Sequence, residues 1–257
     1  MARLPQLRVL SLDLDTDTPP DYAQLAALPA LERFSLRFRG TVPAGVSRLA
    51  RLSALRLTFA GPGQAAPPPT AAALTASLQA ALEPLRGLTH LQLAVSTFQA
   101  GWALPPALAQ LSSLRRFMLA GPDEGDAMRI ALPPGPWLAS LEWAALPAAT
   151  VVASRRALAA ATRLRRLALN DFFERYAQPA DWPAALKWAG RHPPLQCVSL
   201  CTYALSEEAL CQRLASEQHD PSMLTEALAA LRRRRPTLFV EPGRSLLQAL
   251  REGGAEY

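Results

Sequence analysis

The sequence predicts an α/β solenoid, with short parallel strands on a concave face and helices and loops on a convex face. Three observations predict it: leucines recur in one phase, the clearest copies start 21 to 36 residues apart, and each copy ends with apolar residues at alternating positions. Alternation with period two is what a short strand buried on one face requires. A single unit of this kind cannot bury its apolar face, so neighbouring units must stack and share one core.

The repeat has the form L-x-x-L-x-x-L-x-L and is clearest in the first half of the chain. Intact copies begin at Leu4, Leu49 and Leu85, and copies with Phe at one site begin at Leu28 and Leu111. Weaker copies occupy the segments 138–143, 164–169 and 195–200. We therefore predict about eight repeats over residues 1–205, well above the minimum of about three that a stable stack needs.

This pattern resembles the leucine-rich-repeat superfamily over about residues 4–203. The segments VPAGVSRLARLSALRLTFAG (42–61) and LPPALAQLSSLRRFMLAG (104–121) look like the plant-type repeat, in which Pro begins the convex segment. The resemblance implies a curved stack of parallel strands used for protein–protein recognition. The family usually places Asn or Cys three residues after the last strand leucine, where the side chain bonds backbone groups of adjacent turns. This chain departs from that rule, since those positions hold Asp15, Arg39, Ala60, Ser96, Pro122, Phe172 and Tyr203.

The departure predicts an irregular stack. Only Asp15 and Ser96 could replace the family's Asn, and Asn170 is off-register. Buried backbone groups at the bends must then be satisfied in another way, by water or by local helix.

Helices are predicted where the spacing lengthens. Between Leu49 and Leu85, Thr70 is a suitable N-cap, Leu74, Leu78 and Leu82 form one apolar stripe, and Pro84 ends the helix. The Gly- and Pro-rich segment 121–137 is predicted to be a loop. Longer helices should precede the strands at 164–169 and 195–200, the second one beginning at Asp181.

Residues 206–257 are predicted to form a mostly helical C-terminal cap. A helix should begin near Ser206, and Asp220-Pro221 is a strong start for another. Residues 237–241 fit one last strand. The N-terminus has no comparable segment because the repeat already begins at Leu4, so we expect either upstream residues or another chain to cover that end, and favour the former.

Composition excludes several classes of protein. The net charge is +6 over 257 residues, but Lys187 is the only Lys, so the Arg excess fits GC-rich codon usage as well as selection for a basic surface. No nucleic-acid-binding module accompanies the charge, which makes nucleic acid a disfavoured partner. No apolar run is long enough to span a membrane, three cysteines do not make a disulfide framework, and the aspartates from Asp13 onward do not fit a signal peptide. We expect a cytoplasmic protein.

No catalytic motif is present, so we predict neither an enzyme nor a bound cofactor. The nearest approach to a metal site is His192 with Cys197, Cys201 and Cys211. On a strand, Cys197 and Cys201 would lie about 13 Å apart, whereas one zinc needs both sulfurs at about 2.3 Å. We therefore predict no metal site. The run Arg232 to Arg235 is interpreted as cations offsetting a helix C-terminal dipole, and Asp13, Asp15 and Asp17 as a solvated strand end.

The remaining candidate is the concave face, where strand residues between the buried leucines must point. We predict a basic band that binds another protein, expected to be acidic. Its proposed members are Arg33, Arg37, Arg39, Arg56, His90, Gln92, Arg116 and Arg166. The leading hypothesis is a non-enzymatic interaction scaffold. The alternative is the recognition part of a receptor kinase or ubiquitin-ligase assembly whose effector domain lies outside this chain.

Overall fold

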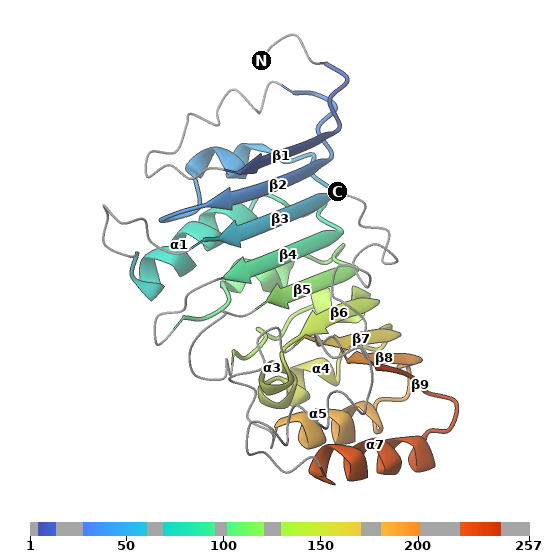
Figure 1. The fold of residues 1–257 in the computed structure, drawn as a ribbon. Coiled ribbons are helices and arrows are strands. Elements are labelled where there is room, and N and C mark those ends of the chain that lie inside the picture. Colours follow the sequence, from blue (N-terminus) through green and yellow to red (C-terminus); the bar gives the residue numbers. More distant parts are fainter. Residues whose placement is uncertain are drawn as a thin grey trace.

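The computed structural model describes residues 5–13, 28–60, 69–95, 102–120, 130–170, 181–200 and 222–242. Its strands form one nine-stranded sheet in which spatial order equals sequence order and every neighbouring pair is parallel (Figure 1). The strands are β1 Val9–Asp13, β2 Arg33–Phe38, β3 Ala54–Phe59, β4 His90–Val95, β5 Arg116–Ala120, β6 Trp143–Leu146, β7 Arg166–Leu169, β8 Cys197–Leu200 and β9 Phe239–Pro242.

Short helical segments connect most of these strands and stack along the sheet (Figure 1). They are η2 Ala44–Arg48, α1 Ala71–Leu82, η3 Pro106–Gln110, α2 Trp137–Ser140, α3 Ala148–Ala153, α4 Arg155–Leu158, α5 Asp181–Ala189 and α7 Ser222–Arg234. One strand and one convex segment per turn, repeated in sequence order, is the architecture of a leucine-rich-repeat solenoid. The predicted α/β fold class is confirmed.

In the copies from Leu28 to Leu138, the first two leucines form a tight turn that leads the chain into its strand. The N–H of Leu52 donates to the carbonyl of Leu49 at 3.0 Å, and the same bond joins Leu88 to Leu85 at 3.0 Å. All four side chains are buried. We call this unit the leucine turn. Its apolar side chains contribute to the core while its backbone satisfies one donor internally.

The leucine turn continues into the degenerate part of the chain with other residues in its first position. There the N–H of Leu164 donates to Ala161, that of Leu195 to His192 and that of Leu238 to Arg235, at 3.1, 3.2 and 2.9 Å. The repeat is thus geometrically regular to its end, although its first leucine is replaced three times.

Backbone bonds also tie each repeat to the next just before the strands. The carbonyl of Glu32 accepts the N–H groups of Ser53 and Ala54 at 2.9 and 3.1 Å, and the carbonyl of Thr89 accepts those of Arg115 and Arg116 at 2.9 and 3.0 Å. One carbonyl serving two donors fixes the register of neighbouring strands, so equivalent residues of successive repeats lie side by side.

Helix α1 occupies the long spacing between the third and fourth repeats, as predicted. The Thr70 side chain accepts the N–H of Ala73 at 3.1 Å, and Leu74, Leu78 and Leu82 are buried. Polar side chains of α1 also bond neighbouring repeats: Ser77 Oγ accepts the N–H of Val42 at 3.1 Å. On the other side, Gln79 Oε1 accepts the N–H of Ala107 at 2.7 Å. These bonds satisfy backbone donors in the convex segment that follows β2 and in η3.

Asn170, which is off-register for the family's Asn position, nevertheless bonds backbone groups of neighbouring repeats. It follows β7 directly and is 1% exposed. Its N–H donates to Leu146 O at 3.0 Å, and its Nδ2 donates to Leu119 O at 2.9 Å. One side chain therefore reaches past the short strand β6 to β5. Asp15 and Ser96, the two residues predicted to substitute for the family's Asn, lie outside the described residues.

The C-terminal part continues the same sheet. Helix α7 buries Leu224, Leu228 and Leu231, and the predicted last strand is confirmed as β9, which pairs in parallel with β8. Helix α5 begins at Asp181, as predicted. The predicted loop over 121–137 is too long, because Trp137 already begins α2. The boundary predicted at 205/206 lies outside the described residues and stays a prediction.

Candidate functional site on the concave face

Strand register arranges the concave side chains in three rows. Adjacent parallel strands lie about 4.8 Å apart, so neighbours in a row are close together. The first row runs Val9, Arg33, Ala54, His90, Arg116, Trp143, Arg166, Cys197 and Phe239. The second runs Ser11, Ser35, Arg56, Gln92, Met118, Ala145, Ala168 and Ser199. The third runs Asp13, Arg37, Thr58, Ala94 and Ala120.

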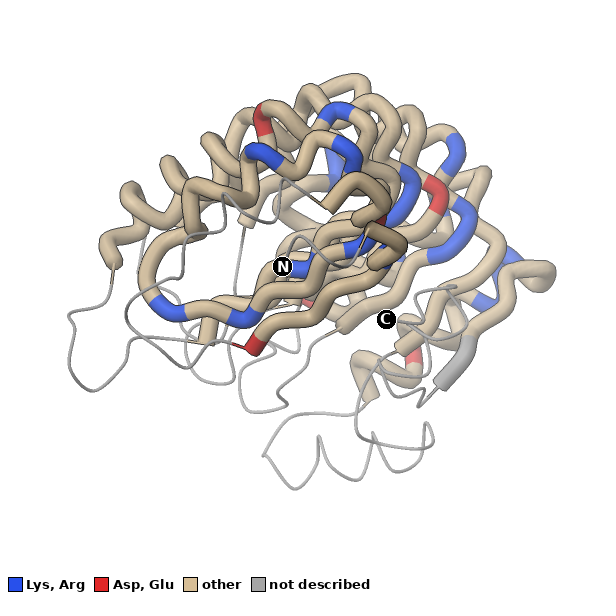
Figure 2. The backbone as a smooth tube through the Cα atoms, turned by 90° about the horizontal axis from the view of Figure 1, so that it is seen from above, with Lys and Arg blue, Asp and Glu red and all other residues tan. Residues whose placement is uncertain are grey.

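Seven of the eight residues predicted to bind a partner fall in these rows. Because the leucine and phenylalanine positions of β2 to β5 are buried in the core, the alternate positions face the other way. Arg39 is the exception, since it follows the end of β2. In Figure 2 basic residues recur on consecutive turns of the backbone. The predicted face of each strand residue is therefore right, although nothing here tests whether a partner binds it.

The part of the face over β2 to β5 is polar. Arg33, Arg56, His90 and Arg116 are partly exposed, and Arg37 is exposed. We call these five residues the concave basic surface. Arg37 Nη1 lies 3.5 Å from Asp13 Oδ2, with both side chains more than half exposed. An ion pair so open to water stabilises the fold only weakly.

The part over β5 to β7 is apolar and buried, which corrects the predicted continuous band. Met118, Ala120, Ala145 and Ala168 form a second apolar cluster, separate from the main core, and Trp143 packs against it. Ala145 is 0% exposed. Trp143 also stands between Arg116 and Arg166 in the first row. Residue spacing predicts the direction of a side chain but not the burial that tertiary packing gives it, so Arg166 is separated from the concave basic surface.

His90 lies in the middle of the concave basic surface and reports its electrostatics. The pKa of its imidazole is lowered from 6.5 to about 4, and burial is the largest cause of this shift. The charges of Arg116, Arg33 and Arg115 also lower the pKa, while a hydrogen bond to the Ser53 backbone acts in the opposite direction. The ring is therefore neutral at pH 7. The charged neighbours that act on the ring are all cations, so the local potential is positive and favours an anion.

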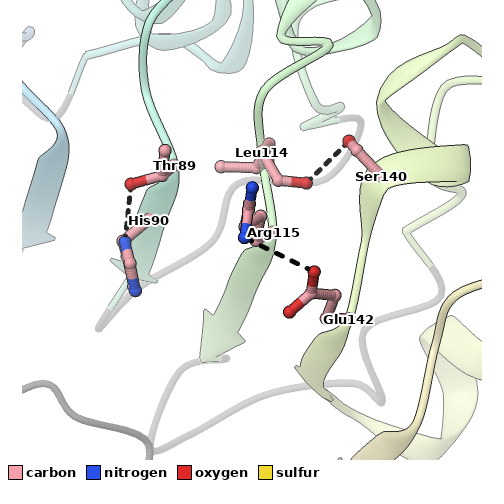
Figure 3. A network of polar contacts seen from close by, with 6 residues as sticks. All are labelled: Thr89, His90, Leu114, Arg115, Ser140 and Glu142. Carbon is pink, nitrogen blue, oxygen red and sulfur yellow. Dashed lines mark hydrogen bonds and ion pairs between the residues drawn. The ribbon is translucent and has the colours of Figure 1, made fainter.

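A short hydrogen-bond chain sets the tautomer of His90. The hydroxyl of Thr89 donates to Ser53 O at 2.8 Å, so its oxygen is left to accept a hydrogen bond from His90 Nδ1, also 2.8 Å away (Figure 3). This assignment follows from the network, since a hydroxyl has a single proton to donate. It leaves Nε2 of His90 as an acceptor.

Two neighbouring polar side chains have buried atoms without a partner. Among the described residues, neither Gln92 Oε1 on β4 nor Arg116 Nη1 on β5 makes a hydrogen bond, and Gln92 is 4% exposed. Arg116 is opposite His90 in the sheet, and His90 is two residues before Gln92 on β4. An unsatisfied buried polar group costs about 1–3 kcal/mol. One acceptor atom and one donor atom on adjacent strands of this face are therefore buried and unpaired within the described part of the chain.

Charged residues directly before two neighbouring strands, Arg115 and Glu142, pair with each other and help to join successive repeats. Arg115 Nη1 lies 3.7 Å from Glu142 Oε1, and the hydroxyl of Ser140 donates to Leu114 O at 2.9 Å (Figure 3). Glu142 belongs to the repeat after Arg115. These contacts join two successive repeats beside the concave basic surface.

Among the residues considered for a metal site, His192 has a structural role. His192 is buried, its Nε2 is 3.0 Å from Ala161 O, and its ring stacks on Trp188 at 4.8 Å between centroids. Burial lowers the pKa of His192, and its hydrogen bond to Ala161 acts in the opposite direction. Within the described part of the chain, no three His, Cys, Asp or Glu side chains come together, while Cys201 and Cys211 fall outside it.

Arg235 has a different role from the one predicted for the run of four arginines. Helix α7 ends at Arg234, so only Arg232 to Arg234 lie in its last turn. The guanidinium of Arg235 instead donates to the carbonyls of His192, Pro193 and Leu195, at 3.0, 3.2 and 2.8 Å. Sequence reasoning missed the roles of His192 and Arg235. Extending the L-x-x-L spacing backward from Leu195 and Leu238 would have found both.

No family model matches the chain, and no curated protein sequence matches it. Solved structures of similar fold include an internalin (inlF) from Listeria monocytogenes str. 4b F2365, with a TM-score of 0.44 and 14% sequence identity. The match covers 81% of this chain and 52% of the internalin, so the chain spans about half the length of that protein.

The class of the protein is defined by its own geometry. Nine parallel strands in sequence order, joined by leucine turns and short convex segments, make it a leucine-rich-repeat solenoid. Within the described residues, no helix is both long and apolar enough to cross a membrane.

Proposed function

We propose that this chain is a non-enzymatic protein-interaction scaffold that binds an acidic protein partner on the concave basic surface. The observation that carries the proposal is the register of β2 to β5, which gathers Arg33, Arg56 and Arg116 on one face around a neutral His90. Complementary charge of this kind guides encounter and excludes partners of the same sign. We place the interaction in the cytoplasm.

The extent of the surface supports a protein ligand over a small molecule. Its basic side chains come from four consecutive strands and are spread over all three rows. Adjacent strands are about 4.8 Å apart, so the surface spans roughly 14 Å across the sheet. A sheet face of that width fits an extended segment or an element of another protein.

The test is charge reversal with a matched control. The test variant carries Arg37→Glu, Arg56→Glu and Arg116→Glu. In affinity purification with quantitative mass spectrometry, the amount of native partner that it retains should be at least about tenfold lower than for the wild-type chain. The control is Arg48→Glu, Arg86→Glu and Arg163→Glu, which changes the net charge equally at exposed positions outside the concave rows. It should retain the same partners as the wild-type chain. Equal loss in both variants, or no loss in the first, contradicts the proposal.

A further inference from the structure

Gln92 is the most buried polar side chain on the concave face, and its position does not require a polar residue. Its row continues with Met118, Ala145 and Ala168, which bury apolar side chains at the equivalent point of the next three strands. An apolar residue at 92 would therefore fit the same geometry. Instead, Gln92 Oε1 is buried with no hydrogen-bond partner among the described residues.

Arg116 completes the pair. It lies on the adjacent strand, opposite His90 and diagonal to Gln92, and its Nη1 is also buried without a partner in the described part of the chain. An unpaired acceptor and an unpaired donor on adjacent strands are complementary to a ligand that carries the opposite pair. Buried groups of this kind are rare in native structures and concentrate at functional sites.

Charge selects between the ligands that could carry such a pair. The concave positions of β2 to β5, all of them described, include four arginines and no Asp or Glu. The pKa of His90 is lowered by Arg116, Arg33 and Arg115 in addition to burial, so the ring stays neutral beside a positive field. A ligand group that meets Arg116 here is stabilised when it is an anion.

We propose that the concave face contains a recognition site for an acidic peptide segment of the partner, in which Arg116 binds a side-chain carboxylate and Gln92 Oε1 accepts a main-chain N–H of the same segment. This inference rests on the proposed function and names the chemistry of its central contact. A carboxylate supplies acceptors for the guanidinium, and the peptide N–H supplies the donor that a simple anion lacks.

Binding requires a local rearrangement. Gln92 Oε1 and Arg116 Nη1 are both buried in the free protein, so a ligand reaches them only after neighbouring side chains move. Arg56 lies beside Gln92 in the second row and has a long, flexible side chain. Rotamer changes of this kind are common at interfaces and leave the backbone in place.

The probe is a hexaglutamate peptide with an acetylated N-terminus and an amidated C-terminus, labelled with an uncharged dye and titrated by fluorescence anisotropy in about 0.1 M NaCl. We expect saturable binding to the wild-type chain and a loss of at least about tenfold in affinity for Arg116→Gln. The matched control Arg86→Gln removes one exposed charge from the same repeat as Gln92 and should stay within about twofold. Absence of saturable wild-type binding, or equal losses in the two variants, overturns the site.

Two further measurements test Gln92 itself. Gln92→Met keeps the length of the side chain and removes its polar atoms, so it should weaken the peptide at least about fivefold while raising the Tm of the free protein. The same peptide with N-methylated backbone nitrogens keeps every carboxylate but loses its donors, and should bind the wild-type chain as weakly as the unmodified peptide binds Gln92→Met. A fall in Tm for Gln92→Met shows that Gln92 has a structural partner, and undiminished binding of the N-methylated peptide shows a non-specific anion surface. Either result overturns the proposal.

Failure of this site can be told apart from failure of the proposed function. If the concave triple reversal loses native partners while Gln92→Met retains the hexaglutamate peptide, the concave face binds acidic proteins by another contact. If the triple reversal retains all partners, the concave face is not the interaction surface.

Discussion

The two halves of the solenoid use different residues at the first position of the leucine turn. From the second to the sixth repeat, the chain turns into each strand with a leucine in the first position of the leucine turn, from Leu28 to Leu138. In the seventh to ninth repeats that position holds Ala161, His192 and Arg235. The last two bond backbone carbonyls through their side chains: His192 bonds Ala161, and Arg235 bonds His192.

The difference teaches that the turn has two separate requirements. It must bury or pair its side chain, and it must place the following strand in register. Leucine meets the first requirement by packing, whereas His192 and Arg235 meet it by hydrogen bonds to the same position of the preceding repeat. A repeat can therefore lose its defining leucine and keep its geometry.

The concave face does not follow the same division. Strands β2 to β5 carry the concave basic surface, while the strands from β5 to β7 bury Met118, Ala145 and Ala168 in a second apolar cluster. Strands β5 and β6 both follow regular leucine turns, at Leu111 and Leu138, so the same kind of turn leads into a polar and into an apolar part of the face. Regular turns alone thus do not predict where a partner binds.

The largest expected effect comes from removing a leucine of a regular turn. Leu111 is 0% exposed in the main core, so Leu111→Ala should lower the free energy of unfolding by about 2–5 kcal/mol through lost burial and a cavity. Urea unfolding followed by circular dichroism measures it. A loss below about 1 kcal/mol would show that the turn tolerates alanine in the N-terminal half as it does at Ala161.

The hydrogen-bonded turn should respond less strongly. Arg235→Leu replaces a guanidinium that serves three carbonyls with the residue type found at the regular turns, and should lower the free energy of unfolding by about 1.5–3 kcal/mol. Arg232→Leu, an exposed change in the preceding helix, is the comparison and should stay within about 0.5 kcal/mol. A stabilised Arg235→Leu would mean that packing by leucine is sufficient in both halves.

Acid should lower the free energy of unfolding through one histidine in each half, His90 and His192. The folded pKa values of His90 (about 4) and His192 are below the ordinary value of 6.5, so the unfolded chain binds more protons below pH 6.5 and their contribution to stability is lost as pH falls from there. In the variants His90→Gln and His192→Gln, the fall in unfolding free energy between pH 7 and pH 5 should be smaller than in the wild-type chain. Equal falls in all three proteins would place the acid sensitivity elsewhere.

A higher salt concentration should change the pKa values of the two histidines by different amounts. The shift of His90 has three arginine contributions and that of His192 has one, after burial in each case. Because salt screens partly exposed charges, raising NaCl from about 0.05 to 0.5 M should raise the pKa of His90 more than that of His192. NMR titration of the two imidazole Hε1 signals measures this, and a larger change at His192 contradicts the assignment of causes.

The smallest effect is expected for the ion pair at the N-terminal edge. Arg37 and Asp13 are both more than half exposed, so Arg37→Gln should change the free energy of unfolding by less than about 0.5 kcal/mol. Thermal unfolding at low salt measures it. A larger loss would mean that β1 depends on this pair for its place in the sheet.

Much of the fold could be predicted because it depends on local periodicity. Alternating residues fixed which face Arg56 and Arg116 occupy, and a capping residue with an i, i+4 stripe located α1 from Thr70 to Leu82. The last strand was predictable for the same reason, since its short apolar run follows a segment with the apolar spacing of a helix.

The candidate site could be predicted only in part. The direction of Gln92 follows from period two, but the absence of a partner for its Oε1 depends on where side chains of two other strands settle. The bonds of Asn170 to Leu119 and of Arg235 to His192 join residues 51 and 43 positions apart, and no local pattern specifies either.

The sequence by itself therefore determined the leucine-rich-repeat class, the order of strands and the face of each concave residue, because those properties repeat along the chain. The tertiary structure decided that the regular leucine turn continues through Ala161, His192 and Arg235, and that the basic surface stops at β5. Burial and hydrogen bonding depend on which side chains of neighbouring repeats meet, and that meeting is set by the stacking of the whole solenoid.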